Sequence, residues 1–218
     1  MMRRFAILAA ALLLTSCHHN ERLADAAAEG NAAAQYEYGR RLLAGEKGLR
    51  ANPHQAALWL TAASLRGHVK AQSLLGWCYA QGRGVEKSAA ESRRWYEAAA
   101  YQGSTIACLE LAGDSLRNER GPDAARWLQP LAEAGYPGPQ NILGKLCLMG
   151  KGGAIPQGEA QRYLRFAAMS GDAEACLLMG YCYAAGIGVP RNEVLMNGWL
   201  RLAAEHGDPT AQKLLATP

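Results

Sequence analysis

Residues 82–84 (Gly-Arg-Gly) place two glycines around a basic residue, directly after an apolar stretch. Such a loop could cradle a phosphate, because closely spaced glycines let backbone N–H groups approach an anion. A Walker A loop also needs a preceding strand and a Gly-Lys-Ser/Thr ending, and neither accompanies this segment. A second copy occurs at residues 186–188 (Gly-Ile-Gly), inside a longer stretch that resembles the first. We therefore interpret these glycines as marks of an internal repeat, not as a phosphate site.

The serines and histidines lack the sequence patterns of a catalytic or metal site. No serine has a lysine three residues later, and no Gly-x-Ser-x-Gly sequence occurs, so nothing indicates a serine nucleophile. The sequence contains no His-Glu-x-x-His and no cysteine–histidine spacing of a metal site. We expect no catalytic residue, no metal and no cofactor. The five histidines are expected on the solvated surface: His18, His19, His54, His68 and His206.

Five cysteines follow Cys17, and all fall in segments that we predict to be helices. The first possibility is that they are small buried side chains in positions that alanine could also occupy. The second is that neighbouring helices are linked by disulfides, for which the pairs Cys78–Cys108 and Cys147–Cys176 are conceivable. Packed helix axes lie roughly 8–10 Å apart, whereas a disulfide requires Cα atoms within about 7 Å, so the first possibility is favoured.

The N-terminus has the pattern of an export signal. Two arginines precede the apolar run 5–14, which is too short to cross a bilayer, since crossing needs about 20 residues. Residues 14–17 (Leu-Thr-Ser-Cys) then resemble a bacterial lipobox. The resemblance implies a signal peptide over 1–16, a lipidated Cys17 and a tether over 17–22. Because His18 replaces the aspartate that signals inner-membrane retention, we expect an outer-membrane lipoprotein facing the periplasm. The alternative is an ordinary secretory signal.

The net charge argues against a nucleic-acid partner. It is +4 for the whole chain and falls to about +2 without the two arginines of the signal. No dense Lys/Arg cluster stands out, as a nucleic-acid-binding surface would require. We expect no nucleic acid.

The strongest pattern is a repeat of 32 to 37 residues. It is carried by six glycines, here called marker glycines: Gly30, Gly67, Gly103, Gly135, Gly171 and Gly207. Eight residues before each of the last five lies a large aromatic side chain: Trp59, Trp95, Trp127, Tyr163 and Trp199. The fourth residue after each marker glycine is alanine or proline, and the ninth is glycine or alanine. These positions predict five units near residues 31–67, 68–103, 104–135, 136–171 and 172–207.

Each unit reads as two helices joined by a glycine-containing loop. The first, helix A, starts just after the marker glycine and presents small residues on one face. The second, helix B, is amphipathic and carries the aromatic residue. The third unit is shorter and lacks the pair of loop glycines, so we expect a tighter turn between its helices. No alternating strand pattern occurs, and the chain is predicted to be all-α.

These positions resemble the Sel1-like repeat, a relative of the tetratricopeptide helix–turn–helix. The resemblance covers residues 23–216 and is weakest in units one and three. It implies a right-handed α-solenoid of about five Sel1-like helix–turn–helix repeats with flanking capping helices, over residues 23–218. In such folds each repeat is stabilised by its neighbours.

The resemblance to the tetratricopeptide repeat also implies a binding groove along the A helices. Ten residues after the marker glycines lie Arg40, Trp77, Lys145 and Tyr181, and one helical turn earlier lie Tyr36 and Asn141. We expect these six side chains to bind a protein or peptide partner, either an extended peptide or an acidic protein segment, or else a glycan. The alternative is that they are ordinary exposed residues or pack between repeats.

We therefore expect a non-catalytic protein–protein interaction scaffold or adaptor, anchored in the bacterial cell envelope through Cys17. The alternative is a cell-wall hydrolase or β-lactam-binding protein, since some Sel1-like proteins are described in those terms.

Overall fold

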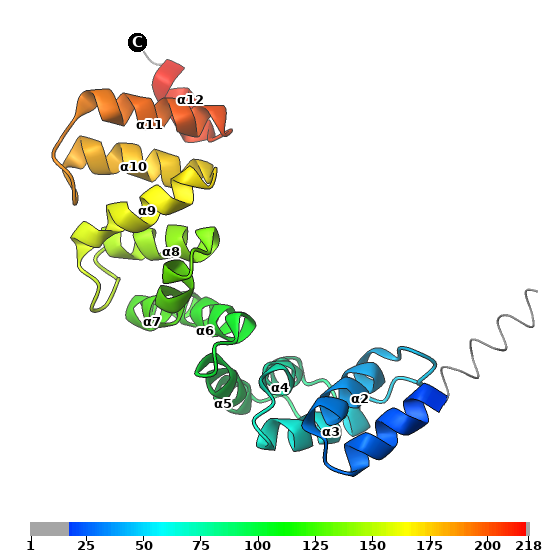
Figure 1. The fold of residues 1–218 in the computed structure, drawn as a ribbon. Helices are drawn as coiled ribbons and strands as arrows, with labels where there is room; N and C mark the ends of the chain where they lie inside the picture. Colours follow the sequence, from blue (N-terminus) through cyan, green and yellow to red (C-terminus); the bar gives the residue numbers. More distant parts are fainter. Residues whose placement is uncertain (1–17, 217–218) are drawn as a thin grey trace, which may run out of the picture. The chain divides into compact units, whose positions relative to one another are not determined.

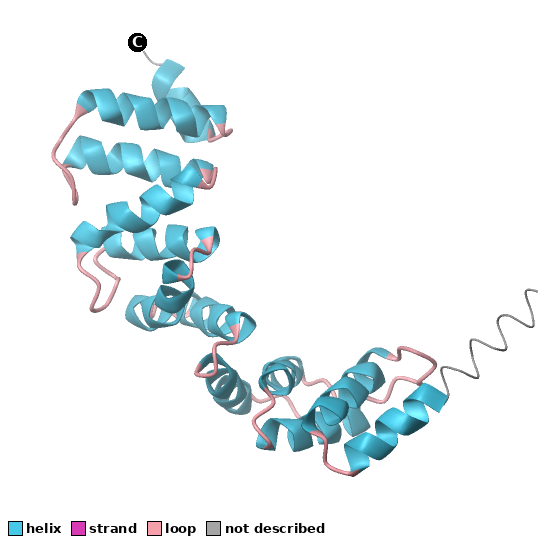
Figure 2. Ribbon diagram, viewed as in Figure 1, coloured by secondary structure: helices cyan, strands magenta, loops and turns pink. Residues whose placement is uncertain are grey.

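The computed structural model describes residues 18–216, and in this range all regular secondary structure is helical (Figures 1 and 2). The signal segment 1–16 and Cys17 lie outside the described residues. The first helix covers residues 18–28, so it begins inside the segment that we expected to be a tether. No helix within 18–216 combines the length and apolar character needed to span a bilayer.

The chain divides into two compact units, with the boundary between Ala107 and Cys108. The N-terminal unit contains the helix 18–28 and two helix pairs. The A and B helices of the first pair are α2 (Ala32–Ala44) and α3 (Pro53–Leu65), and those of the second are α4 (Val69–Gln81) and α5 (Ala89–Ala100). The boundary falls within α6 (Thr105–Arg117), the A helix of the third repeat.

The C-terminal unit continues the same arrangement of helix pairs. The third B helix is α7 (Gly121–Glu133), and the fourth pair is α8 (Pro137–Leu148) with α9 (Ala160–Met169), preceded by the 3₁₀ turn η1 (Gln157–Glu159). The fifth pair is α10 (Ala173–Ala185) with α11 (Glu193–Glu205), and α12 (Pro209–Ala216) follows as a short cap.

The residue after a marker glycine begins an A helix by capping it. The side chains of Asn31, His68 and Asp172 accept hydrogen bonds from the backbone N–H three residues later. Such bonds satisfy N–H groups that the first turn of a helix leaves without partners. The A helices α2, α4 and α10 end at glycines with left-handed backbone, which the sequence places at each loop entry.

The core is built where helix A crosses helix B of the same repeat. A Cβ on Gly76 would lie 3.0 Å from the ring of Tyr96, and one on Gly144 would lie 2.6 Å from Leu164 Cγ. The absence of a side chain therefore sets how closely the two helices approach. The aromatic residues that mark helix B fill this core: Trp95, Trp127 and Tyr163 are buried. The small residues predicted on one face of helix A thus face helix B of the same repeat.

The third repeat has the tighter turn that its length predicts. Only residues 118–120 separate α6 from α7, against 82–88 between α4 and α5. With no glycine pair available, Glu119 adopts a left-handed backbone (φ 55°). Arg120 fixes the turn through an ion pair to Asp114 at 2.8 Å.

Candidate functional site

The loop glycines that first suggested phosphate binding instead mediate packing between repeats. Gly84, at φ 78°, lies directly against the backbone carbonyl of Pro53 at the start of the preceding helix B. Gly188, at φ 70°, lies against the carbonyl of Gly158 in the same way. A side chain would have no room at either position. The Gly-x-Gly loop is therefore a joint between consecutive repeats.

In the N-terminal unit, the expected groove residues are engaged to different degrees. Tyr36 stacks on His68, with ring centroids 4.8 Å apart. Arg40 forms ion pairs with Glu37 and Glu46, at 3.0 and 2.8 Å. By contrast, Trp77 is 37% exposed.

In the C-terminal unit, two of the expected groove residues likewise have partners within the protein and one is exposed. Asn141 is buried, and its Nδ2 donates to Asp172 Oδ2 at 2.9 Å. The Nζ of Lys145 forms an ion pair with Glu174 at 2.6 Å. Tyr181 is 55% exposed. The two aromatic side chains ten residues after a marker glycine therefore present open surface, whereas both cations at this position are ion-paired.

The position one turn earlier joins one A helix to the next. Tyr36 meets His68, and Ser73 Oγ lies 2.8 Å from Ser104 Oγ. Asn141 bonds to Asp172 in the same manner. In each pair the second residue caps the following A helix through its own side chain. Tyr36 and Asn141 are thus part of inter-repeat packing, which was the alternative for the groove residues.

A glutamine that the sequence analysis did not single out recurs five residues after four of the marker glycines. The Nε2 of each glutamine donates to the backbone carbonyl eight residues earlier, near the end of the preceding helix. The bonds are Gln35 to Ala27, Gln72 to Ser64, Gln140 to Ala132 and Gln212 to Ala204. The spacing was visible in the sequence, since all four glutamines share one register. Cys108 and Cys176 take this position in the other repeats.

All five described cysteines are free and buried, which agrees with the first possibility considered above. Burial raises the pKa of Cys78 and of Cys182 to about 11. A thiolate is the reactive form of cysteine, so these thiols are poor nucleophiles at neutral pH.

We therefore expect these five thiols of the native protein to react very slowly with a thiol reagent such as dithionitrobenzoate. All five buried thiols should react once the chain is unfolded in guanidinium. Rapid reaction of one or more of them in the native state would show that its helix opens locally. A disulfide would appear as a deficit of thiols after unfolding without reductant.

The histidines differ in solvent exposure more than expected. His54 and His206 are exposed, as predicted. His68 is only partly exposed, because it caps α4 and stacks on Tyr36. Desolvation and the nearby charge of Lys70 lower its pKa, which favours the neutral ring that accepts the capping hydrogen bond. The expectation of a solvated surface residue was wrong for His68.

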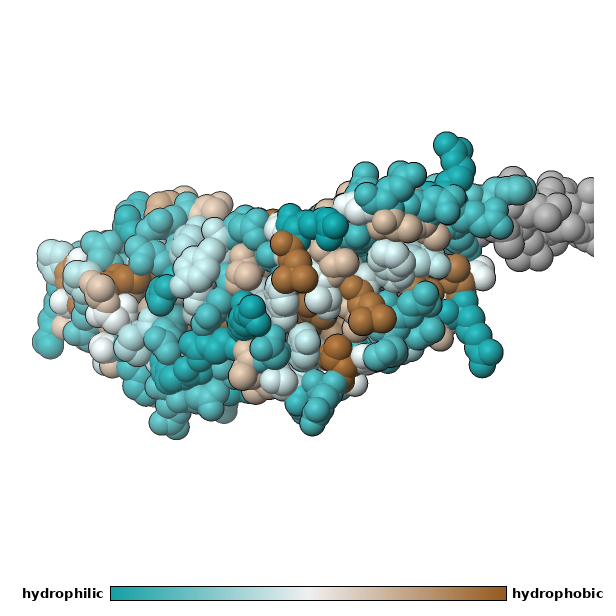
Figure 3. Space-filling model, turned by 90° about the horizontal axis from the view of Figure 1, so that it is seen from below, coloured by the Kyte–Doolittle hydropathy of each residue, from teal (hydrophilic) through white to brown (hydrophobic). Residues whose placement is uncertain are grey.

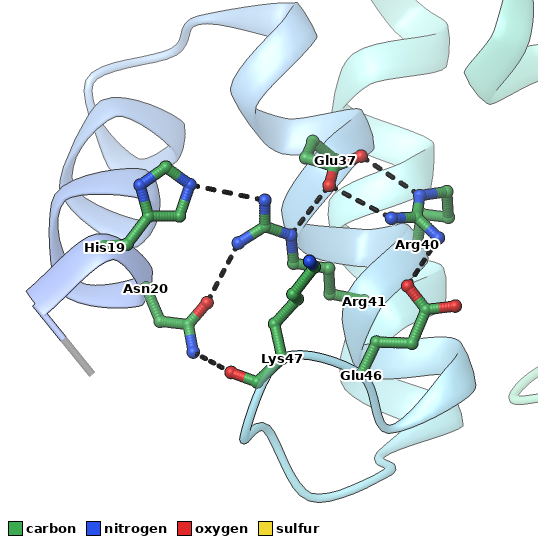
Figure 4. A network of polar contacts seen from close by, with 7 residues as sticks. All are labelled: His19, Asn20, Glu37, Arg40, Arg41, Glu46 and Lys47. Atoms are coloured by element: carbon green, nitrogen blue, oxygen red, sulfur yellow. Dashed lines mark hydrogen bonds and ion pairs between the residues drawn. The ribbon is translucent and has the colours of Figure 1, made fainter. Parts of the chain in front are cut away.

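A polar network joins the helix 18–28 to the first repeat (Figure 4). The buried guanidinium of Arg41 donates to Glu37 Oε1 at 2.7 Å and to Asn20 Oδ1 at 3.0 Å. Asn20 Nδ2 donates in turn to the backbone carbonyl of Lys47 at 2.7 Å. Glu37 also receives two hydrogen bonds from Arg40. Its carboxylate is thus shared by two guanidinium groups, an arrangement that favours the charged form.

The hydrogen bond from Arg40, together with that from Arg41, lowers the pKa of Glu37 from 4.5 to about 2. A group whose pKa is lower in the folded state stabilises the fold above its unfolded pKa and loses that contribution as the pH falls. We expect the wild type to lose about 1 kcal/mol more than Glu37→Gln between about pH 6 and about pH 2.5, after allowance for solvent screening. Urea unfolding of both proteins at the two pH values measures the difference. Identical pH dependence would mean that the network contributes nothing.

No constellation of a catalytic or metal site emerges within 18–216. In this range no three His, Cys, Asp or Glu side chains gather as metal ligands. On the face drawn in Figure 3, hydrophilic residues predominate, with apolar side chains among them. Trp77 and Tyr181 are among the exposed large apolar side chains of this range, and they share one position of the repeat.

Stacked helix pairs with inter-repeat joints at fixed positions define the class of the protein as an α-solenoid built from short helical repeats. The Sel1 repeat profile matches residues 32–68, 69–104, 140–172 and 173–208. The chain belongs to the Sel1 repeat family, whose members generally serve as protein-interaction scaffolds. The profile does not match residues 105–139, which contain the shortened third repeat.

Two solved structures show the same fold. A protective antigen of uropathogenic Escherichia coli is 29% identical, with a TM-score of 0.70 over 87% of this chain and 41% of its own. A Sel1 repeat protein from Oxalobacter formigenes is also 29% identical, with a TM-score of 0.68 over 86% of this chain and 78% of its own. The chain therefore spans less than half the length of the first of these proteins.

Among curated proteins, the chitin synthase regulator SKT5 of Malassezia restricta is 40% identical over 72 residues. The match covers 32% of this chain and 5% of that protein.

Proposed function

We propose that this protein is a non-catalytic scaffold that holds partner proteins at the bacterial cell envelope, anchored in the outer membrane through a lipidated Cys17. The observation that carries the scaffold role is the exposure of Trp77 and Tyr181 on equivalent positions of α4 and α10. Trp and Tyr are the side chains most often found at the centre of protein interfaces, because they bury a large area at low entropic cost.

The ion pairs around these residues favour a particular kind of partner. Arg40 and Lys145 were expected to attract an acidic segment, but each is paired with carboxylates of the chain itself. A partner gains little from a charge that is already compensated. The proposed partners are therefore proteins or peptides that offer apolar and hydrogen-bonding groups to Trp77 in the N-terminal unit or to Tyr181 in the C-terminal unit. A glycan, which also stacks on aromatic rings, is the competing outcome.

The recognition test replaces both aromatic side chains. The variant Trp77→Ala/Tyr181→Ala is expected to keep its helical circular dichroism and to lose a partner that crosslinks to the wild type in intact cells. A matched control is Leu58→Ala/Phe166→Ala, which removes two exposed apolar side chains from the B helices α3 and α9. Equal loss in both variants would indicate a general surface effect and not recognition.

The anchoring is tested separately. Growth with radiolabelled palmitate should label the wild type and leave Cys17→Ala unlabelled and released from membranes. Labelled protein should fractionate with the outer membrane, as expected for a lipoprotein with histidine at position 18. An unlabelled wild type would overturn the anchor while leaving the recognition test intact.

A further inference from the structure

The helix 18–28 is fixed to the first repeat at both of its ends. Near its start, Asn20 is buried and joins Arg41 of α2 to the backbone of Lys47 (Figure 4). Near its end, Ala27 is fully buried, and its carbonyl accepts a hydrogen bond from Gln35. Residues 18–28 are thus part of the folded repeat array and not a flexible tether.

This attachment limits how far the first repeat can lie from Cys17. Three residues of chain span at most about 11 Å, so Asn20 lies within that distance of Cys17 in any conformation. The carbonyl of Lys47 is hydrogen-bonded to the side chain of Asn20 at 2.7 Å. The loop after α2 therefore accompanies Cys17 wherever Cys17 is held.

We propose that residues 18–22 and 46–50 form a membrane-facing edge that rests on lipid headgroups when Cys17 is acylated. This inference depends on the anchoring proposed above. An acyl anchor places residue 17 at the bilayer surface. In the proposed orientation the edge beside the helix lies in or near the headgroup layer, and the other end of the helix is directed away from the membrane.

The charges of the edge suit the phosphates of a lipid surface. Arg22 and Arg50 are exposed there. The carboxylates are partly compensated within the protein: Glu46 pairs with Arg40, and Glu21 lies 3.3 Å from the ring of His18. Basic side chains near an anionic lipid surface are attracted to it, and the attraction falls off within a Debye length. A lipid surface is the occupant that both the chain connection and the charges indicate.

The test uses acylated full-length protein in vesicles of phosphatidylethanolamine and phosphatidylglycerol that carry a headgroup nitroxide quencher. A maleimide fluorophore is attached at Arg50→Cys on the edge, or at Arg66→Cys as the matched control. Arg66 is an exposed arginine of the same repeat whose guanidinium lies against Gly30, beyond the other end of the helix. The native cysteines are buried and Cys17 is blocked by acylation, so only the introduced thiol is labelled.

We expect quenching roughly threefold or more stronger at position 50 than at position 66, because the helix separates the two by roughly 15 Å. Equal quenching, or stronger quenching at position 66, would contradict the proposed orientation. Absence of quenching at both positions in acylated, vesicle-bound protein would mean that the edge stands off the membrane. A wild type that is never acylated would instead remove the anchoring on which the inference depends.

A second variant tests the attachment itself. Asn20→Ala removes the link between Arg41 and Lys47 while leaving the ion pair of Arg41 with Glu37 in place. In protein with unchanged helicity, the difference in quenching between positions 50 and 66 should shrink at least twofold. An unchanged difference would show that the orientation does not depend on this network.

Discussion

Replacing Gly84 with alanine is expected to destabilise the N-terminal unit by about 3 kcal/mol, through strain and overpacking together. The methyl group would meet the carbonyl of Pro53 and would lie 3.0 Å from the backbone N of His54. Backbone atoms cannot rotate away as a side chain can, so the whole joint between the first two repeats must shift. Because repeats are stabilised by their neighbours, this damage should spread beyond the loop.

Gly103→Ala is the matched control for this substitution. Gly103 has a similar left-handed backbone, φ 84° against 78°, but nothing lies within 4 Å of its added Cβ. It should therefore show only the conformational penalty, about 1 kcal/mol. Urea unfolding followed by tryptophan fluorescence compares the two variants with the wild type. Equal destabilisation would mean that Gly84 is required only for its backbone angle and that the loop is not a packing joint.

The second large effect is expected at Gly144 in α8. An added Cβ would lie 2.6 Å from Cγ and 2.8 Å from Cδ2 of Leu164, a fully buried side chain of α9. Overpacking of this kind costs about 1–3 kcal/mol, and we expect a value near the upper end because Ala160 O also lies 3.3 Å away. Thermal unfolding of Gly144→Ala measures it.

Two companion variants separate packing from helix propensity. Gly198→Ala in α11 adds the same methyl group where nothing lies within 4 Å, so it should stabilise by about 0.5–1 kcal/mol. Leu164→Ala should remove the clash. Gly144→Ala should therefore be nearly neutral when it is introduced into the Leu164→Ala protein. A double-mutant cycle detects this coupling. Additive losses in that cycle would contradict the proposed contact between α8 and α9.

The repeat architecture could be predicted from the sequence because it depends on local, recurring features. Marker glycines, helix caps and the aromatic residue of helix B each act within one repeat, at fixed spacing. The tight turn at residues 118–120 followed from length alone, since too few residues remain for a glycine-containing loop. The close packing at Gly76 and Gly144 likewise followed from small residues recurring on one face of helix A.

The interaction surface was harder to predict, because it depends on which side chains are already engaged by the next repeat. Asn141 and Tyr36 have the right position for a groove, yet each meets the residue that caps the following A helix. Arg40 was expected in the binding groove, but Glu46 of the adjoining loop pairs with it. The attachment of Asn20 to Arg41 joins residues 21 positions apart and follows no repeat period, so nothing in the spacing indicated it.

The most direct test of the scaffold role is crosslinking in intact cells with the acylated wild type, the Trp77→Ala/Tyr181→Ala variant and the Leu58→Ala/Phe166→Ala control as baits. We predict that a discrete protein is captured by the wild type and by the control and is lost with the aromatic variant. Capture that persists in a folded Trp77→Ala/Tyr181→Ala protein would contradict the account, because recognition would then not depend on the exposed aromatic side chains of the A helices.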